Sequence, residues 1–160
     1  MREQPNERIA TDAVKAWQLT AHLIAIIPLL LTIAAFVVNY YFEPFPYWIG
    51  IILAAITIVE WGITAFLIPK LRWRRWRYQI YDQEVYIQHG ILIVTRTVVP
   101  MIRVQHVDTQ QGPILKKYGL STLEISTAAT THEIPALLEE EAADLRDQIS
   151  ELARVEQDDV

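Results

Sequence analysis

Two long apolar segments dominate the pattern of hydrophobic and polar positions in the first half of the chain. Residues 17–42 contain no Lys, Arg, Asp or Glu, and residues 47–68 contain a single acidic residue, Glu60. A helix needs about 20 apolar residues to cross a bilayer. A chain of 160 residues has too little other core to bury two such helices. The pattern therefore predicts a transmembrane hairpin over residues 17–69, with helices at about 17–39 and 47–69.

Four prolines shape the predicted hairpin. Pro44 and Pro46 lie between the two segments, in a short aromatic stretch. Proline cannot donate a backbone hydrogen bond, and it disfavours helix in the residue before it. The segments therefore cannot form one continuous helix, and we expect them to run antiparallel. For the same reason Pro28 is a candidate kink in the first helix, and Pro69 is expected to end the second.

The second half of the chain alternates between apolar and polar positions, as β-strands do. Strands are predicted at residues 78–81, 85–88, 91–99, 102–107, 120–126 and 131–134, with a turn or a helical turn at 112–119. The last stretch has helical period, with one apolar face formed by Leu138, Ala142, Leu145, Ile149 and Leu152. We expect this helix to cover the open face of the strands and residues 155–160 to fray. The result is an α+β or partly open barrel architecture.

Charge is distributed unevenly along the chain. The net charge is −5, yet residues 70–77 carry five basic side chains and no acidic one, whereas residues 137–160 carry nine acidic and two basic ones. Basic residues flank membrane helices on their cytoplasmic side, and the connection between the two segments has none. A multi-pass protein of the cell membrane with both termini in the cytoplasm is predicted. Its parts are an N-terminal segment at 1–16, the hairpin at 17–69, a cytoplasmic domain at 70–155 and an acidic tail at 156–160.

The cationic cluster after the second helix is the best candidate for lipid contact. A cation just outside a membrane helix gains about 1 kcal/mol from anionic lipid, and tryptophan favours the membrane–water boundary. Basic residues among tryptophans also occur where proteins stack on nucleic acid, but the position directly after a membrane helix favours lipid, and no nucleic-acid partner is expected. The predicted head-group contacts, here called the basic collar, are Lys70, Arg72, Arg74, Arg75 and Arg77. The predicted interface anchors are Trp17, Trp73 and Trp76.

Two ionisable residues lie inside the predicted membrane segments. Glu60 is about eight residues, or roughly 12 Å, from the cytoplasmic end of its helix, and His22 is about five residues from the same side. An ionisable group inside a membrane is costly and usually has a partner. We hypothesise that Glu60 is protonated, or pairs with His22 or with a second subunit. The alternative is a polar residue that only assists helix packing.

Catalytic chemistry has no support in the sequence. The chain has no cysteine, no glycine-rich phosphate loop and no His-Glu-x-x-His motif. His22, His89, His106 and His132 lack the spacing of zinc ligands, and each is interpreted as structural or solvated. No catalytic residue, metal or cofactor is therefore predicted, and an enzyme is not expected.

Several motifs together resemble the bacterial pleckstrin-homology-like membrane proteins. They are Trp76-Arg-Tyr-Gln-Ile-Tyr-Asp82, Val85-Tyr-Ile-Gln-His-Gly90, Val99-Pro-Met-Ile-Arg-Val-Gln-His-Val107, Tyr118-Gly-Leu-Ser-Thr-Leu-Glu-Ile-Ser-Thr127 and Ile134-Pro135. The resemblance covers residues 15–153, and its most specific part is the Pro-x-x-Arg-x-Gln-x-Val pattern at 100–107; Thr127-Ala-Ala departs from it where a glycine is expected. It implies membrane residence, no enzyme activity, and a nearly closed barrel of about seven strands capped by a C-terminal helix. It also implies a hetero-complex with a larger relative that carries several such domains.

Two functions remain open at this point. In the first, the hairpin holds a non-catalytic adaptor domain at the cytoplasmic leaflet, where it docks a related membrane protein or lipid head groups; tethering makes weak contacts effective. In the second, the chain is a small subunit of a channel or transporter that uses Glu60. Because two helices alone make a poor pathway, the second function requires a homo-oligomer. The sequence names no ligand for either.

Overall fold

The computed structural model describes residues 4–42 and 45–158, which form two compact units. One unit, here called the head, combines the described residues up to Ala16 with those from Leu71 onward. The other, here called the hairpin, runs from Trp17 to Lys70. Packing therefore divides the chain differently from its hydropathy pattern, because the segment before the first apolar helix belongs to the folded head. Glu43 and Pro44 lie outside the described residues.

Long helices make up the hairpin, as their apolar composition predicts. Both helical stretches are long and apolar enough to cross a membrane. Pro28 lies inside the first helix, which continues past it. The bounds are α1 Ala13–Phe42, α2 Tyr47–Gly62, a π-helical turn η1 Ile63–Leu67, and α3 Ile68–Arg75.

Pro69 does not end the second helical stretch, so that prediction was wrong. The π-helical turn η1 ends two residues before it, and the backbone N–H of Ile68 donates to the carbonyl of Ile63, five residues back. Such local π-helical adjustments re-satisfy backbone groups around a proline in membrane helices. The helix therefore passes through Pro69 and extends to Arg75.

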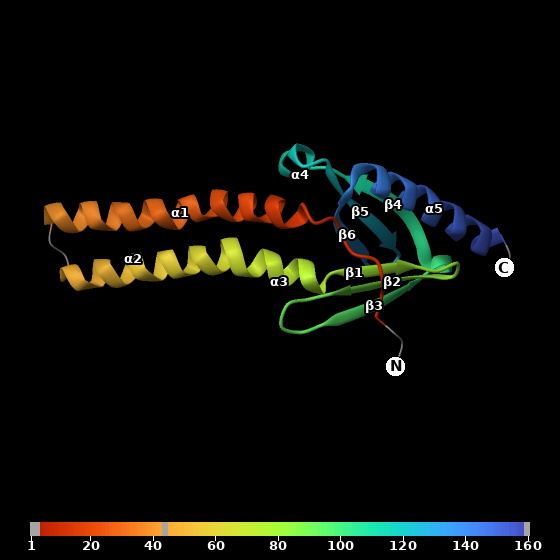
Figure 1. Ribbon diagram of the computed structural model, residues 1–160, viewed down its shortest axis with the longest axis horizontal. Coiled ribbons are helices and arrows are strands. Elements are labelled where there is room, and N and C mark those ends of the chain that lie inside the picture. The colour runs from red at the N-terminus through yellow and green to blue at the C-terminus, as the bar shows by residue number, and fades with distance from the viewer. Residues whose placement is uncertain (1–3, 43–44, 159–160) are drawn as a thin grey trace. The chain divides into compact units, whose positions relative to one another are not determined.

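Small and hydroxylated residues join α1 to α2, which lie side by side and run antiparallel (Figure 1). The hydroxyls of Thr32 and Thr57 are 2.9 Å apart, and both side chains are buried. Gly50 faces the ring of Phe36 so closely that a Cβ on Gly50 would lie 2.9 Å from it. Close approach at small residues and interhelical hydrogen bonds are typical of helix pairs in membranes.

The head contains two antiparallel sheets of three strands each. Sheet A has the order β1-β2-β3 and sheet B the order β4-β5-β6. The strands are β1 Arg77–Ile80, β2 Glu84–His89, β3 Thr95–Pro100, β4 Val104–Gln110, β5 Leu120–Thr127 and β6 Thr131–Leu138. The remaining elements are a 3₁₀ turn η2 Met101–Arg103, a short helix α4 Pro113–Lys117 and the long helix α5 Glu139–Asp158. The expectation of about seven strands in a nearly closed barrel is corrected, because the described residues form six strands in two sheets that are not hydrogen-bonded to each other.

Helix α5 covers sheet B (Figure 1), and the two share the main core. Ala142 and Ile149 of the predicted apolar stripe are fully buried, as are Leu123 and Ile125 of β5. The stripe begins later than predicted, since Leu138 is the last residue of β6 and is 51% exposed. Helix α5 also continues to Asp158, so the expected fraying from residue 155 is not observed in the described part of the tail. Residues 159 and 160 lie outside the described residues.

Two strand predictions also need correction. Residues 91–94 are a loop rather than the first half of a strand, and β3 begins only at Thr95. The cause is Gly90, which has φ +113°, a backbone conformation that turns the chain out of the ladder. Strand β6 runs through Pro135 to Leu138, four residues further than predicted. Ala136 there has φ 53°, and the β5–β6 register shifts nearby, so an irregularity of the ladder accommodates the proline.

Candidate lipid and partner interface

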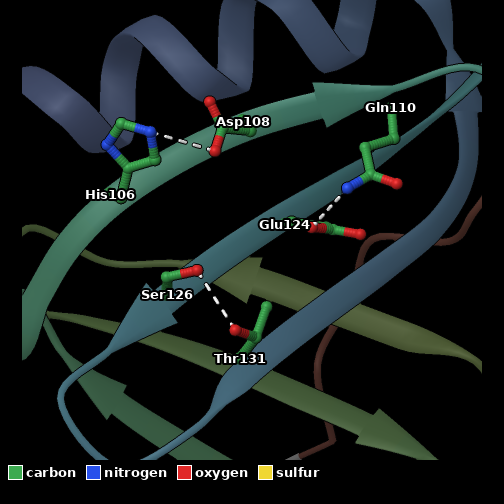
Figure 2. A network of polar contacts seen from close by, with 6 residues as sticks. All are labelled: His106, Asp108, Gln110, Glu124, Ser126 and Thr131. Atoms are coloured by element: carbon green, nitrogen blue, oxygen red, sulfur yellow. Dashed lines mark hydrogen bonds and ion pairs between the residues drawn. The ribbon is translucent and has the colours of Figure 1, made fainter.

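The solvent face of sheet B carries polar side chains that satisfy one another (Figure 2). His106 Nε2 lies 3.1 Å from a carboxylate oxygen of Asp108 on the same strand, and both side chains are exposed. Across the strands Gln110 donates to Glu124 at 2.8 Å. The Ser126 and Thr131 hydroxyls are 3.1 Å apart. These are neighbouring pairs on a solvated sheet, and they include no nucleophile beside a base.

The basic collar lies at the junction of α3 and β1. Its side chains are exposed except that of Arg77, which is half-buried and donates from Nη1 to the carbonyl of Pro5 at 3.3 Å. Arg72 is attracted by the carboxylate of Glu133 on β6. Arg74 and Arg75 end the helix at exposed positions. Within the collar, Arg77 is therefore hydrogen-bonded to the head and Arg72, although exposed, is attracted by Glu133, while Arg74 and Arg75 are exposed at the end of the helix. Whether they contact lipid stays a prediction.

Two of the predicted tryptophan anchors pack within the head. Trp76 is 7% exposed, and its ring stacks on that of His89 with centroids 5.2 Å apart. Trp73 donates from Nε1 to the carbonyl of Ile9 at 3.2 Å. The guanidinium of Arg8 lies 5.5 Å from the centroid of the Trp73 ring, a cation–π distance. The Trp73 ring therefore contacts the N-terminal segment, and the Trp76 ring contacts β2. Trp17 lies half-exposed in α1.

A polar cleft of about 310 Å³ lies between the two sheets, beside the collar. We call it the collar cleft. It brings one guanidinium, two imidazoles and two hydroxyls together with a single carboxylate. Its lining residues are Arg72, Trp76, Ile87, His89, Thr97, Thr131, His132 and Glu133.

The chemistry of the collar cleft suits a small anionic group. A guanidinium, imidazole nitrogens and hydroxyls all donate hydrogen bonds to phosphate oxygens. Partial burial lowers the pKa of Arg72, and attraction by the carboxylate of Glu133 opposes that shift. In the described residues no group of three or more His, Asp or Glu side chains has the arrangement of a metal site. From the sequence, His89 and His132 were each interpreted as structural or solvated; folding brings β2 and β6 together and places both histidines in one cleft.

A second feature, here called the acidic hollow, lies at the start of α5 and has a volume of about 860 Å³. The apolar side chain of Leu138 lines it together with several acidic residues. The lining residues are Gly119, Leu138, Glu139, Glu140, Glu141, Ala143, Asp144 and Leu145. The acidic residues stand in the first turns of the helix, where they also match its dipole.

Glu141 at the edge of this hollow is fixed by the core. It accepts a hydrogen bond of 2.5 Å from the hydroxyl of Tyr78, which is 2% exposed. Burial, followed by this bond to a carboxylate, raises the pKa of Tyr78 well above its usual range. The phenol therefore stays protonated and anchors the start of α5 to sheet A.

The structure does not bring Glu60 and His22 together as a hydrogen-bonded pair among the described residues. His22 Nδ1 accepts from the indole Nε1 of Trp61 at 3.3 Å, and its ring contacts Phe66 edge-on. Glu60 is exposed and lines an apolar hollow of about 440 Å³ on α2, with Val59 among its neighbours. The hypotheses of a second-subunit partner or a protonated carboxyl remain predictions.

Comparison with known proteins identifies a family and two relatives of this chain. The family described as bacterial PH domain matches residues 13–153. The UPF0699 transmembrane protein YdbS of Bacillus subtilis (strain 168) is 54% identical over 160 residues, which is 100% of both chains. The UPF0699 transmembrane protein YdbT of the same organism is 29% identical over 91 residues, 57% of this chain but only 18% of that longer protein. No solved structure shows a significant match. The expected resemblance is confirmed, and the chain belongs to the bacterial PH domain family as a membrane protein.

Proposed function

We propose that the chain is a non-catalytic adaptor of the cell membrane. In this proposal α1 and the α2–α3 stretch cross the bilayer, both termini are cytoplasmic, and the head docks a longer membrane protein of its own family. The apolar helices and the transmembrane relative support the anchor. Bacillus subtilis has both a relative of this length and a longer one that shares part of it, which supports the choice of partner.

The acidic hollow is the observation that carries the docking proposal. Protein interfaces combine an apolar centre with a polar rim. Leu138 is 51% exposed and lines this hollow together with Glu139, Glu140 and Asp144. A partner that presents an apolar side chain among lysines or arginines fits this arrangement, because opposite charges fix the register and speed association. Tethering in the same membrane lets a modest affinity suffice.

Co-purification from native membranes tests the adaptor proposal. Glu140→Gln with Asp144→Asn removes two exposed charges of the acidic hollow. We expect the yield of the longer relative recovered with the full-length chain to fall by about tenfold, or about 1.4 kcal/mol. The control is Asp147→Asn with Glu151→Gln, which removes two exposed charges further along the same helix.

The control variant is expected to recover the partner at the wild-type level. Equal recovery by both double variants would show that the acidic hollow is not the docking surface. Absence of any family member from cross-linked wild-type preparations would remove the proposed partner. Lipid head groups are the second proposed ligand, with their phosphate in the collar cleft. The corresponding measurement is whether the head binds vesicles that contain anionic lipid.

A second candidate function, a channel or transporter subunit, is favoured by the position of Glu60. Its carboxyl lies on the exposed surface of α2, in an apolar hollow, with no hydrogen bond or ion pair to another described residue. A charge exposed to lipid is costly, and a neighbouring copy would cover it. Glu60→Gln is then expected to abolish ion flux and to reduce the oligomer seen in detergent, whereas Thr64→Ala, which changes an uncharged wall of the same hollow, leaves both intact. Unchanged flux and oligomer size in Glu60→Gln would exclude this function.

A further inference from the structure

An exposed apolar loop joins β2 to β3 in the head. Residues 91–94, here called the apolar tip, read Ile-Leu-Ile-Val. Leu92 is 96% exposed, Ile93 82% and Val94 37%. Single exposed apolar side chains are common on protein surfaces, but a run of consecutive ones is unusual unless it contacts something. The head itself leaves Leu92 and Ile93 almost fully uncovered.

The apolar tip is a built turn. The ladder between β2 and β3 continues to the pair His89 and Thr95, so the strands hold both ends of the loop. Gly90 has φ +113°, and a Cβ there would lie 1.9 Å from the carbonyl oxygen of Ile93. Only glycine permits this close approach. The chain is therefore folded tightly back on itself, and the two most exposed side chains stand at its turn.

The apolar tip lies at the end of sheet A where the basic collar enters it. Arg77, the first residue of β1, pairs with Gln88, which is the penultimate residue of β2. Trp76 stacks on His89, which directly precedes the tip. Figure 1 shows the β2–β3 loop at the end of sheet A at which β1 begins. Arg74 and Arg75, both exposed, end the helix just before this point.

We propose that the apolar tip inserts into the interfacial layer of the lipid bilayer. Apolar side chains beside exposed cations match such a surface, since the apolar groups enter the acyl boundary while the cations meet anionic head groups. Only residues 70–76 separate Pro69 from β1 along the chain, so few residues lie between the apolar helix and the strand that begins at this end of sheet A. The inference rests on the proposed membrane anchoring of the head and adds a lipid contact on the head itself.

The absence of cysteine allows one label to test this insertion. Leu92→Cys in the full-length chain is labelled with an environment-sensitive fluorophore and reconstituted in phosphatidylcholine vesicles that contain phosphatidylglycerol and quencher-bearing lipids. The control is Asp82→Cys, an exposed position in the β1–β2 turn at the opposite end of sheet A. The proposal places position 92 about 5–10 Å deep in the interface. The fluorescence of a label at position 92 is then expected to be quenched about twofold more strongly than that of a label at position 82.

Ile93→Cys provides a second label site in case Leu92→Cys alters folding, which thermal unfolding of the labelled proteins detects. Quenching at positions 92 and 93 no stronger than at position 82 would overturn the proposal. Protection of the tip only after addition of a membrane-protein extract would also overturn it, in favour of a protein-binding loop. Because the vesicles contain no partner protein, a failure here leaves the co-purification result of the adaptor proposal unaffected.

Discussion

At the scale of single residues, Tyr78 does more than fill the core. Its ring is buried on the inner face of β1, and its hydroxyl reaches Glu141 at 2.5 Å, at the start of α5. A hydrogen bond to a carboxylate is stronger than one between neutral groups. This residue therefore links sheet A to the helix that covers sheet B.

Tyr78→Phe removes this bond and keeps the ring. Because Glu141 is half-exposed and regains water, we expect the free energy of unfolding of the head at neutral pH to fall by about 1 kcal/mol. Thermal unfolding in detergent measures the change. A variant as stable as the wild type would show that the bond contributes nothing net.

The same substitution changes the dependence of stability on alkaline pH. The pKa of Tyr78 is raised in the folded state, whereas in the unfolded chain it is about 10. Below pH 10 both the folded and the unfolded state keep the phenolic proton, so the contribution of Tyr78 to folding stability is complete. Above pH 10 the unfolded state releases this proton first, so folding stability is lost as pH rises. We expect a shallower alkaline loss in Tyr78→Phe than in the wild type. Parallel curves for the two proteins between neutral pH and pH 11 would contradict this expectation.

At the scale of elements, the segment before α1 acts as an extra edge of sheet A. Glu7 and Tyr78 exchange two backbone hydrogen bonds, at 3.2 and 3.1 Å. Ala10 donates to the carbonyl of Ala136 at 3.1 Å, and Ile9 is 2% exposed. This segment covers an edge that would otherwise present unpaired backbone groups.

Replacement of Ile9 by Ala tests whether the segment is part of the fold. Loss of a fully buried isoleucine typically costs about 2–5 kcal/mol, so we expect a clear fall in the unfolding temperature of the head. Asn6→Ala is the matched control, since that side chain is exposed in the same segment. Equal unfolding temperatures for the two variants would indicate that the segment adds no stability.

The hairpin depends on a different kind of contact. The hydroxyls of Thr32 and Thr57 are 2.9 Å apart, and each is also within hydrogen-bond distance of a carbonyl of its own helix. Since each hydroxyl has one hydrogen, the threonine that donates across the pair gives up the bond to its own carbonyl. We expect Thr32→Val and Thr57→Val each to weaken the α1–α2 association by about 0.6 kcal/mol, and the double variant to lose less than the sum. Unfolding in denaturing detergent measures this. Strict additivity would mean that the two hydroxyls do not interact.

At the scale of the whole molecule, charge beside the apolar helices is expected to set orientation. The two cations Arg74 and Arg75 lie within a few residues of the span, whereas Lys116 and Lys117 lie far from it. The test is made in a Tyr40→Lys background. There we expect Arg74→Gln with Arg75→Gln to increase the fraction of molecules whose C-terminal reporter is outside the cell. The reason is that each cation near the membrane surface contributes about 1 kcal/mol to orientation. Neutralising the two distant lysines is expected to have no effect, and identical reporter distributions would refute the rule for this chain.

Much of this arrangement was predictable from local patterns. The two apolar segments, the β-strands at Tyr78 and Val85 and the apolar face around Ala142 and Ile149 follow from period and composition, because burial of one face imposes that period. The site was less predictable. His89 is far in sequence from the adjacent residues His132 and Glu133, and only the meeting of β2 with β6 places them in one cleft. The apolar tip was misread as strand because β-branched residues favour strands wherever the backbone permits.

The sequence by itself determined what each segment prefers: apolar length predicted the two long helices, alternation predicted most of the strand positions, and charge beside the helices defined the collar. Tertiary structure decided what those preferences became. It ended the ladder at Gly90, where the backbone of Ile93 approaches too closely for any side chain, and it carried the helix through Pro69 by a π-helical turn. It also packed the side chains of Trp73 and Trp76 within the head. Local propensity is a matter of one residue and its neighbours, whereas these outcomes depend on distant backbone atoms that must share the same space.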